Sequence, residues 1–125
     1  MSTLFRLSLV TSLFFALLFT ANAAEPSKDA LSSKQLKQLI ASAKTPEDHQ
    51  KLARHYTAMA AKHEAEAVEH EELAEYYSRH PQYGVKTPQS PNTPQHCKFY
   101  AEHCRKAAKE MRSLAAAHEK MANSK

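Results

Sequence analysis

Alanine recurs at every seventh position along two stretches of this 125-residue chain, and this repeat constrains the fold more than any other feature. Seven is the coiled-coil period, and a small residue at the buried position lets two helix backbones approach closely. We therefore expect an all-α protein built on a long antiparallel hairpin of two heptad-patterned helices. The repeated positions are Ala53, Ala60, Ala67 and Ala74, followed by Ala101, Ala108, Ala115 and Ala122.

Helix-start signals precede both stretches. Thr45-Pro46 offers an N-cap followed by proline at the first helical position, and Thr93-Pro94 repeats this pair. Residues 80–93 carry several prolines and the only glycine, so we expect a proline-rich loop there. An apolar stripe before Thr45 predicts a shorter N-terminal helix. The predicted helices span residues 27–43, 46–79 and 94–123.

The beginning of the chain has the pattern of a secretory signal peptide. Arg6 supplies the positive charge, residues 7–20 are largely apolar, and Ala21-Asn22-Ala23 has the small residues of a cleavage site. An uncleaved membrane anchor is the alternative, but ~14 apolar residues fall short of the roughly 20 that a spanning helix needs. We expect residues 1–23 to be removed and residues 24–125 to form one periplasmic or secreted domain.

Composition excludes several classes of function. A single glycine leaves no glycine-rich loop for a nucleotide, and a formal charge of +4 is too small to indicate a nucleic-acid binder. The chain lacks the Cys-x-x-Cys-His motif of c-type haem and shows no nucleophilic triad, so we expect a protein that is not an enzyme. Few large aliphatic residues remain for a core, which favours a further stabilising element: a homodimer, a disulfide or a bound metal.

The two long helices differ in charge. Residues 46–79 hold eight acidic and four basic side chains, whereas residues 94–125 hold three acidic and seven basic ones. Net charges of opposite sign favour pairing of the two helices with each other, although each exposed ion pair adds little.

The position four residues before each alanine should face the helix interface, and it carries unusual side chains. It holds imidazole, phenol, thiol and thioether groups where leucine would be typical, and Glu66 lies beside it. Imidazole, thiolate and carboxylate ligate metals, and the Cys, Met and His set suits copper or another soft transition metal. The antiparallel arrangement predicts that His70 lies beside Cys104. The predicted metal ligands are His63, Glu66, His70, Cys97, Cys104, Met111 and His118.

The histidines and methionines also have structural interpretations. His63, His70 and His118 fit equally the role of hydrogen-bonded interface residues, and Met111 fits that of a core filler. Other histidines fit the role of polar groups on the surface of an amphipathic helix. We expect four of them on the surface: His49, His55, His80 and His103.

The two cysteines leave two explanations open. Cys97 and Cys104 lie seven residues apart on one helix, about 10.5 Å along its axis, which exceeds the span of a disulfide. They therefore cannot bridge each other. In an oxidising compartment, either an intermolecular disulfide closes a homodimer, or the thiolates bind a metal.

The short first helix should cover only part of the hairpin. At about 16 residues it spans roughly 24 Å, about half the length of the long helices. Joined at Lys44-Thr45, it reaches the end that holds Tyr56 and His118 but leaves the end with His70 and Cys104 uncovered. We expect that end to meet a ligand or a second chain, in which case two hairpins form a dimeric four-helix bundle.

Three segments, HEELAEYY, QHCKFYAEHC and HEKMANSK, carry His-x-x-[Leu/Met]-Ala and His-Cys motifs. This pattern resembles that of a group of small exported bacterial helical-hairpin proteins to which no activity is attached. The architecture is also similar to periplasmic hairpins of the Spy and CpxP type, but their Leu-Thr-x-x-Gln motif is absent, so no residue roles carry over. We expect a periplasmic protein that binds or buffers a copper-like metal; the alternative is a non-catalytic structural or chaperone-like module with an envelope-protein partner.

Overall fold

A computed structural model describes residues 27–81 and 93–124 of the chain. In these two ranges the backbone forms three helices and no strand: α1 (Ser33–Ser42), α2 (Pro46–Arg79) and α3 (Pro94–Asn123). The predicted signal peptide and most of the predicted proline-rich loop lie outside the described residues. Among the helices described, none combines the length and the apolar character that a membrane crossing requires.

The long helices begin where their N-caps place them. Thr45 Oγ1 accepts a hydrogen bond from the backbone N–H of Asp48 at 3.1 Å, and the Asp48 carboxylate accepts one from the N–H of Thr45, also at 3.1 Å. Thr93 Oγ1 accepts from the N–H of His96 at 3.1 Å at the start of α3. These bonds satisfy amide groups that the first helical turn leaves without partners. Both predicted start positions are therefore confirmed.

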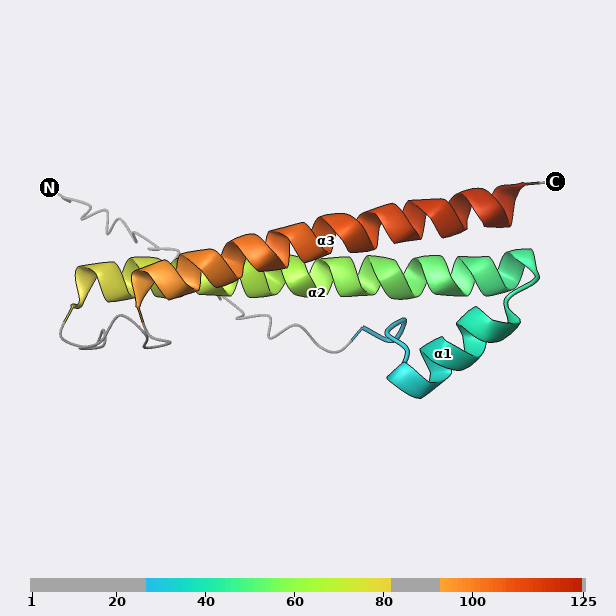
Figure 1. The fold of residues 1–125 in the computed structure, drawn as a ribbon, viewed down its shortest axis with the longest axis horizontal. Helices are drawn as coiled ribbons and strands as arrows, with labels where there is room; N and C mark the ends of the chain where they lie inside the picture. Colours follow the sequence, from blue (N-terminus) through green and yellow to red (C-terminus); the bar gives the residue numbers. More distant parts are fainter. Residues whose placement is uncertain (1–26, 82–92, 125) are drawn as a thin grey trace, which may run out of the picture.

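α2 and α3 form the predicted antiparallel hairpin. Figure 1 shows α3 lying along α2 for most of its length, with the two helices running in opposite directions. Long-range side-chain pairs give the register: Glu66 is opposite Cys104, and His49 is opposite His118. The fold is all-α, and this hairpin is its main body.

The repeated alanines form the buried seam between α2 and α3. Seven of the eight are at most 5 % exposed, Ala67 and Ala108 have no exposed surface, and Ala122 is half-buried. Ala67 packs in the core together with Ala101 and Cys104. Methyl groups at these positions allow the close approach of the two backbones that the repeat predicts. The larger side chains therefore flank the seam on its two sides.

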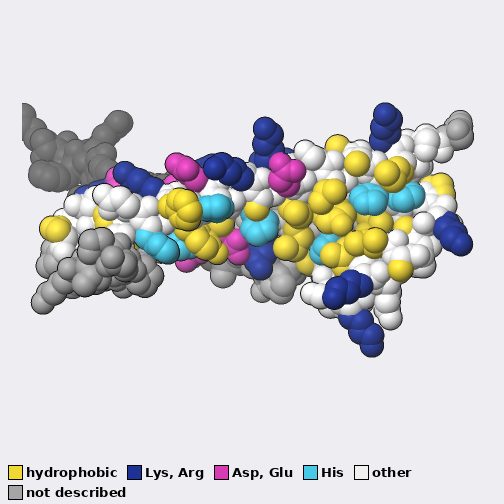
Figure 2. All heavy atoms as spheres, in the orientation of Figure 1, with side chains coloured by type: hydrophobic (Ala, Val, Ile, Leu, Met, Phe, Trp, Pro, Cys, Tyr) yellow, Lys and Arg dark blue, Asp and Glu magenta, His cyan; other side chains and the backbone are white. Residues whose placement is uncertain are grey.

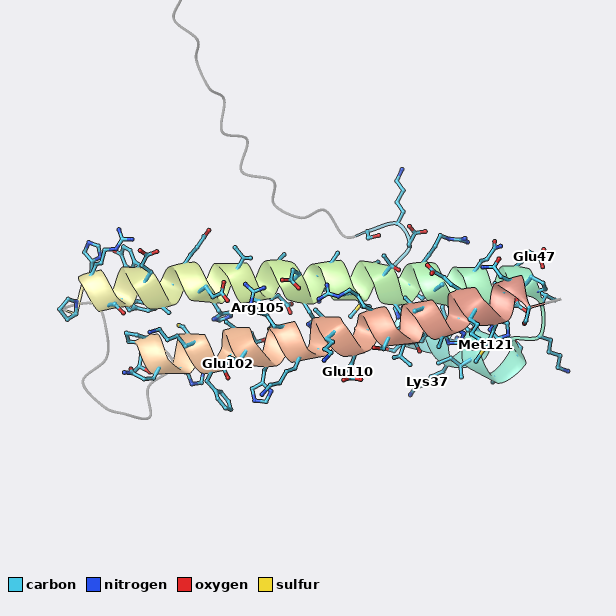
Figure 3. All side chains as sticks on the ribbon, turned by 90° about the horizontal axis from the view of Figure 1, so that it is seen from above. Lys37, Glu47, Glu102, Arg105, Glu110 and Met121 are labelled. Carbon is cyan, nitrogen blue, oxygen red and sulfur yellow. The ribbon has the colours of Figure 1, made fainter. Side chains whose placement is uncertain are left out.

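One side of the seam carries ion pairs between the acidic α2 and the basic α3. The Arg105 guanidinium pairs with both Glu64 and Glu71, and Arg112 pairs with Glu64 at 3.3 Å. Figure 3 shows Arg105 reaching from α3 toward α2, whereas Glu102 lies on the outer side of α3. These contacts agree with the opposite charges of the two helices, and they leave the other side of the seam for the His and Cys side chains.

α1 is shorter than predicted. It starts at Ser33 rather than residue 27 because Ser32 and Gln35 form a capping box that fixes the helix start. The residues before Ser32 contact α2 instead: the N–H of Leu31 donates to His55 Nδ1 at 2.9 Å, and Asp29 lies 3.6 Å from the Arg54 guanidinium. Figure 1 shows α1 beside the first half of α2, so it covers one end of the hairpin only.

Candidate metal centre

Three of the predicted ligands meet between α2 and α3, and we call them the thiol cluster: His63, Glu66 and Cys104. One ligand atom of each lies within 4.8 Å of the other two. His63 Nδ1 is 2.9 Å from Glu66 Oε2, and the Cys104 thiol donates to the same oxygen at 3.8 Å. The carboxylate of Glu66 therefore joins the imidazole to the thiol.

The hairpin geometry explains why these side chains meet. His63 and Glu66 are three residues apart on α2 and so share one face of that helix. The alanine seam brings α3 close enough for Cys104 to reach them. The side chains of His63 and Glu66 are 26 % and 31 % exposed, whereas Cys104 is 5 % exposed. The partly exposed side chains of His63 and Glu66 beside the buried sulfur give an ion a route of entry.

The environment of Cys104 keeps its proton on sulfur in the absence of a metal. Burial raises the pKa of the Cys104 thiol, and the charge of Glu66 and its hydrogen bond raise that pKa further. A metal binds the thiolate and must therefore displace the proton. Metal affinity at this cluster should consequently increase with pH, and binding should release protons.

The spacing of the thiol cluster suits a transition-metal ion. At bond lengths of roughly 2.0–2.3 Å, neighbouring ligand atoms of a tetrahedral site lie about 3.3–3.6 Å apart. Two of the three separations, 2.9 Å and 3.8 Å, flank this range, and the third, from His63 to Cys104, is at most 4.8 Å, so the side chains must move together to bind an ion. Thiolate, imidazole and carboxylate are all zinc ligands, and thiolate with imidazole also suits copper. Three protein ligands leave a further position open to water or to another donor.

His70 lies outside the thiol cluster, and the Cys104 thiol has its hydrogen bond to Glu66 rather than to His70. The His70 ring packs on Tyr100 with ring centroids 4.2 Å apart. Its Nδ1 atom is buried and has no hydrogen-bond partner among the described residues. A buried nitrogen of this kind costs free energy, so His70 would gain from a hydrogen-bond donor, a water molecule or an ion.

The other predicted ligands are spread along the hairpin. Cys97 is 2 % exposed and free, burial raises its pKa, and it lies outside the thiol cluster. Met111 is half-buried on α3, seven residues beyond Cys104. His118 lies at the opposite end and stacks on Tyr56 with ring centroids 5.6 Å apart, and the sequence predicts both residues at that end.

Two histidines assigned to the surface have partners inside the fold. His55 is only 4 % exposed, it accepts the hydrogen bond from Leu31, and burial lowers its pKa, so the surface prediction for His55 is wrong. His49 is half-buried, and its Nδ1 lies 3.1 Å from that of His118. The sequence did contain a signal for His49, because it shares its heptad position with His63. No comparable signal marked His55, whose partner comes from the segment before α1.

One face of the hairpin carries many apolar and histidine side chains. Figure 2 shows hydrophobic and histidine side chains gathered in a band along the molecule, with most Lys and Arg side chains at its margins. Large side chains of α3 remain partly open to solvent, including Tyr100 at 42 % exposed, Leu114 at 40 % and Met121 at 50 %. In the described ranges, α1 covers only the end near the start of α2.

Comparison with known proteins adds no family to these observations. Neither family models, nor curated proteins, nor solved structures give a match to this chain. The functional assignment therefore depends on the chemistry of the side chains themselves. Their most specific arrangement is the thiol cluster, in which the three principal metal-binding side-chain types meet within 4.8 Å.

Proposed function

We propose that this protein is exported and binds a thiophilic transition-metal ion, copper or zinc, at the thiol cluster. It would buffer or deliver the ion rather than catalyse a reaction. The observation that carries this proposal is the convergence of His63, Glu66 and Cys104 within 4.8 Å across two helices. Surface carboxylates often gather without binding an ion, but a buried thiol that shares a carboxylate oxygen with an imidazole is a more specific arrangement.

The two cysteines provide a matched pair for the test. Both are free, buried and on α3, but only Cys104 belongs to the thiol cluster. We expect Cys104→Ser to weaken the binding of Zn²⁺ and Cu⁺ by at least about tenfold, or 1.4 kcal/mol. Cys97→Ser should leave both affinities unchanged. Competition with a chromophoric chelator measures the affinities, and circular dichroism checks that both variants keep their helix content.

Two outcomes would contradict the proposal. One is equal metal binding by the Cys104→Ser variant and the unmodified protein. The other is equal loss in both serine variants, which would indicate general thiol binding rather than a built site. Glu66→Gln gives an independent check, because it preserves the shape of the side chain but removes its charge. We expect this variant to bind more weakly than Cys97→Ser.

A second candidate function is a non-catalytic interaction module, and the partly exposed apolar side chains Tyr100, Leu114 and Met121 favour it. In this proposal a second hairpin covers the apolar side and forms a dimeric four-helix bundle. The burial of Cys97 and Cys104 argues against an intermolecular disulfide as the link. Sedimentation equilibrium with and without reductant tests this candidate. A dimer that persists in reductant supports it, and a monomer at all concentrations contradicts it.

A further inference from the structure

A pair of histidines lies at the opposite end of the hairpin from the thiol cluster. His49 in the first turn of α2 faces His118 near the end of α3, with their Nδ1 atoms 3.1 Å apart. His49 precedes His63 by 14 residues, and His118 follows Cys104 by 14 residues. The pair is therefore about 21 Å from the thiol cluster along both helices. One ion cannot bind at both places.

The separation of the two nitrogens is that of an N–H···N hydrogen bond, and it also lies in the range for two ligands on a single metal ion. The ring centroids are 5.3 Å apart, so the rings must turn slightly for both nitrogens to face one ion. Two imidazole nitrogens bound at 2.0–2.1 Å lie about 2.9 Å apart at a right angle and about 3.3 Å apart at the tetrahedral angle. The measured 3.1 Å falls between these limits. His49 and His118 are 69 residues apart in the chain, so an ion held by both would connect two helices rather than two turns of one helix.

The surroundings favour the neutral imidazole that a metal requires. Burial lowers the pKa of His118, and the charge of His49 lowers it further. Tyr56 stacks on the His118 ring with an interplanar angle of 10° and so limits its rotation. Neutral imidazoles without a thiolate suit borderline divalent cations such as Cu²⁺, Ni²⁺ and Zn²⁺.

We infer that His49 and His118 form a second, thiol-free chelate for a borderline divalent cation. The ion joins the start of α2 to the end of α3, and water molecules occupy its remaining positions. This chelate differs from the thiol cluster in chemistry, because it has no soft ligand. It also differs in its effect on the fold, since it joins α2 to α3 at the end of the hairpin where no loop connects them.

Ni²⁺ is the probe of choice, and the full-length mature chain carrying Cys104→Ser is the background, because that substitution removes the sulfur of the thiol cluster. Calorimetric titration should detect Ni²⁺ binding in this background. Adding His49→Gln or His118→Gln should weaken the binding by more than about tenfold. Adding His103→Gln, which replaces an exposed histidine of α3, should leave the affinity for Ni²⁺ unchanged.

A second readout needs no histidine substitution. Bound Ni²⁺ is paramagnetic, so it should broaden the nuclear magnetic resonance signals of residues around His49 and His118 and spare those around His63. Ni²⁺ should also raise the midpoint of thermal unfolding, because it binds the folded state only. These measurements remain informative if one of the glutamine variants does not fold.

Three results would overturn the inference: Ni²⁺ binding that survives both His49→Gln and His118→Gln, equal loss in His103→Gln, or broadening elsewhere in the chain. Each would mean that the two rings form a hydrogen bond and nothing more. Because the background lacks the Cys104 sulfur, the outcome is independent of whether the thiol cluster binds a metal.

Discussion

Replacing Ala67 by leucine is the most direct test of the alanine seam. Ala67 has no exposed surface and packs against Ala101 and Cys104 at the centre of the hairpin. Leucine and alanine are both strong helix formers, so the substitution changes volume at the seam and hardly changes helix propensity. The added methyl and methylene groups have no space unless α3 moves away from α2.

Overpacking of a well-packed core costs roughly 1–3 kcal/mol. For a domain of 60–100 residues, each kcal/mol lowers the midpoint of thermal unfolding by roughly 4–8 °C. We therefore expect Ala67→Leu to lower this midpoint by at least about 4 °C. Displacement of α3 should also separate Cys104 from Glu66, so metal binding at the thiol cluster should weaken in parallel.

Thermal unfolding followed by circular dichroism measures the effect, and Ala65→Leu is the control. Ala65 lies two residues away on the same helix, but it is exposed. The control should unfold at nearly the same temperature as the unmodified chain. If Ala67→Leu is as stable as Ala65→Leu, the close approach of the helices at Ala67 is refuted.

Three further predictions concern protonation and charge. Burial lowers the pKa of His55 and of His118, so the unfolded state binds more protons, and urea midpoints should fall as pH drops through the ordinary histidine range; a flat profile contradicts this. In Cys97→Ser, ultraviolet titration should find the Cys104 thiolate forming above the usual cysteine pKa; a normal value contradicts it. Arg105→Gln should destabilise the chain slightly in low salt and not in high salt; a salt-independent loss contradicts its ion-pair role.

Local signals in the sequence predicted most of the fold. Thr45-Pro46 and Thr93-Pro94 mark the starts of α2 and α3, and the heptad alanines identify the sides on which they pack. These features act within one or two helical turns, so the sequence alone reveals them. The start of α1 was predicted six residues too early, because the segment before Ser33 contacts α2 instead of continuing the helix. Such a long-range contact leaves no periodic pattern.

The candidate site was predictable in composition but not in pairing. The sequence placed imidazole, carboxylate and thiol groups along one side of the seam, and three of them do meet. The predicted neighbour of Cys104 was His70, whereas the hydrogen bond of the Cys104 thiol goes to Glu66, four residues before His70 on the same helix. The offset between two antiparallel helices depends on packing across the seam, which a sequence repeat does not specify.

A seam made of methyl groups also has a property that a leucine seam lacks. The alanines repeat every seven residues on both helices. If α3 slid along α2 by one heptad, alanine would therefore meet alanine again. The alanines thus determine the distance between the helices, but they alone do not fix how far one helix is shifted along the other. That shift is set by pairs beside the seam, such as Arg105 with Glu71, Cys104 with Glu66, and His49 with His118. An ion bound at the thiol cluster or by His49 and His118 would therefore favour the translational state in which these pairs meet.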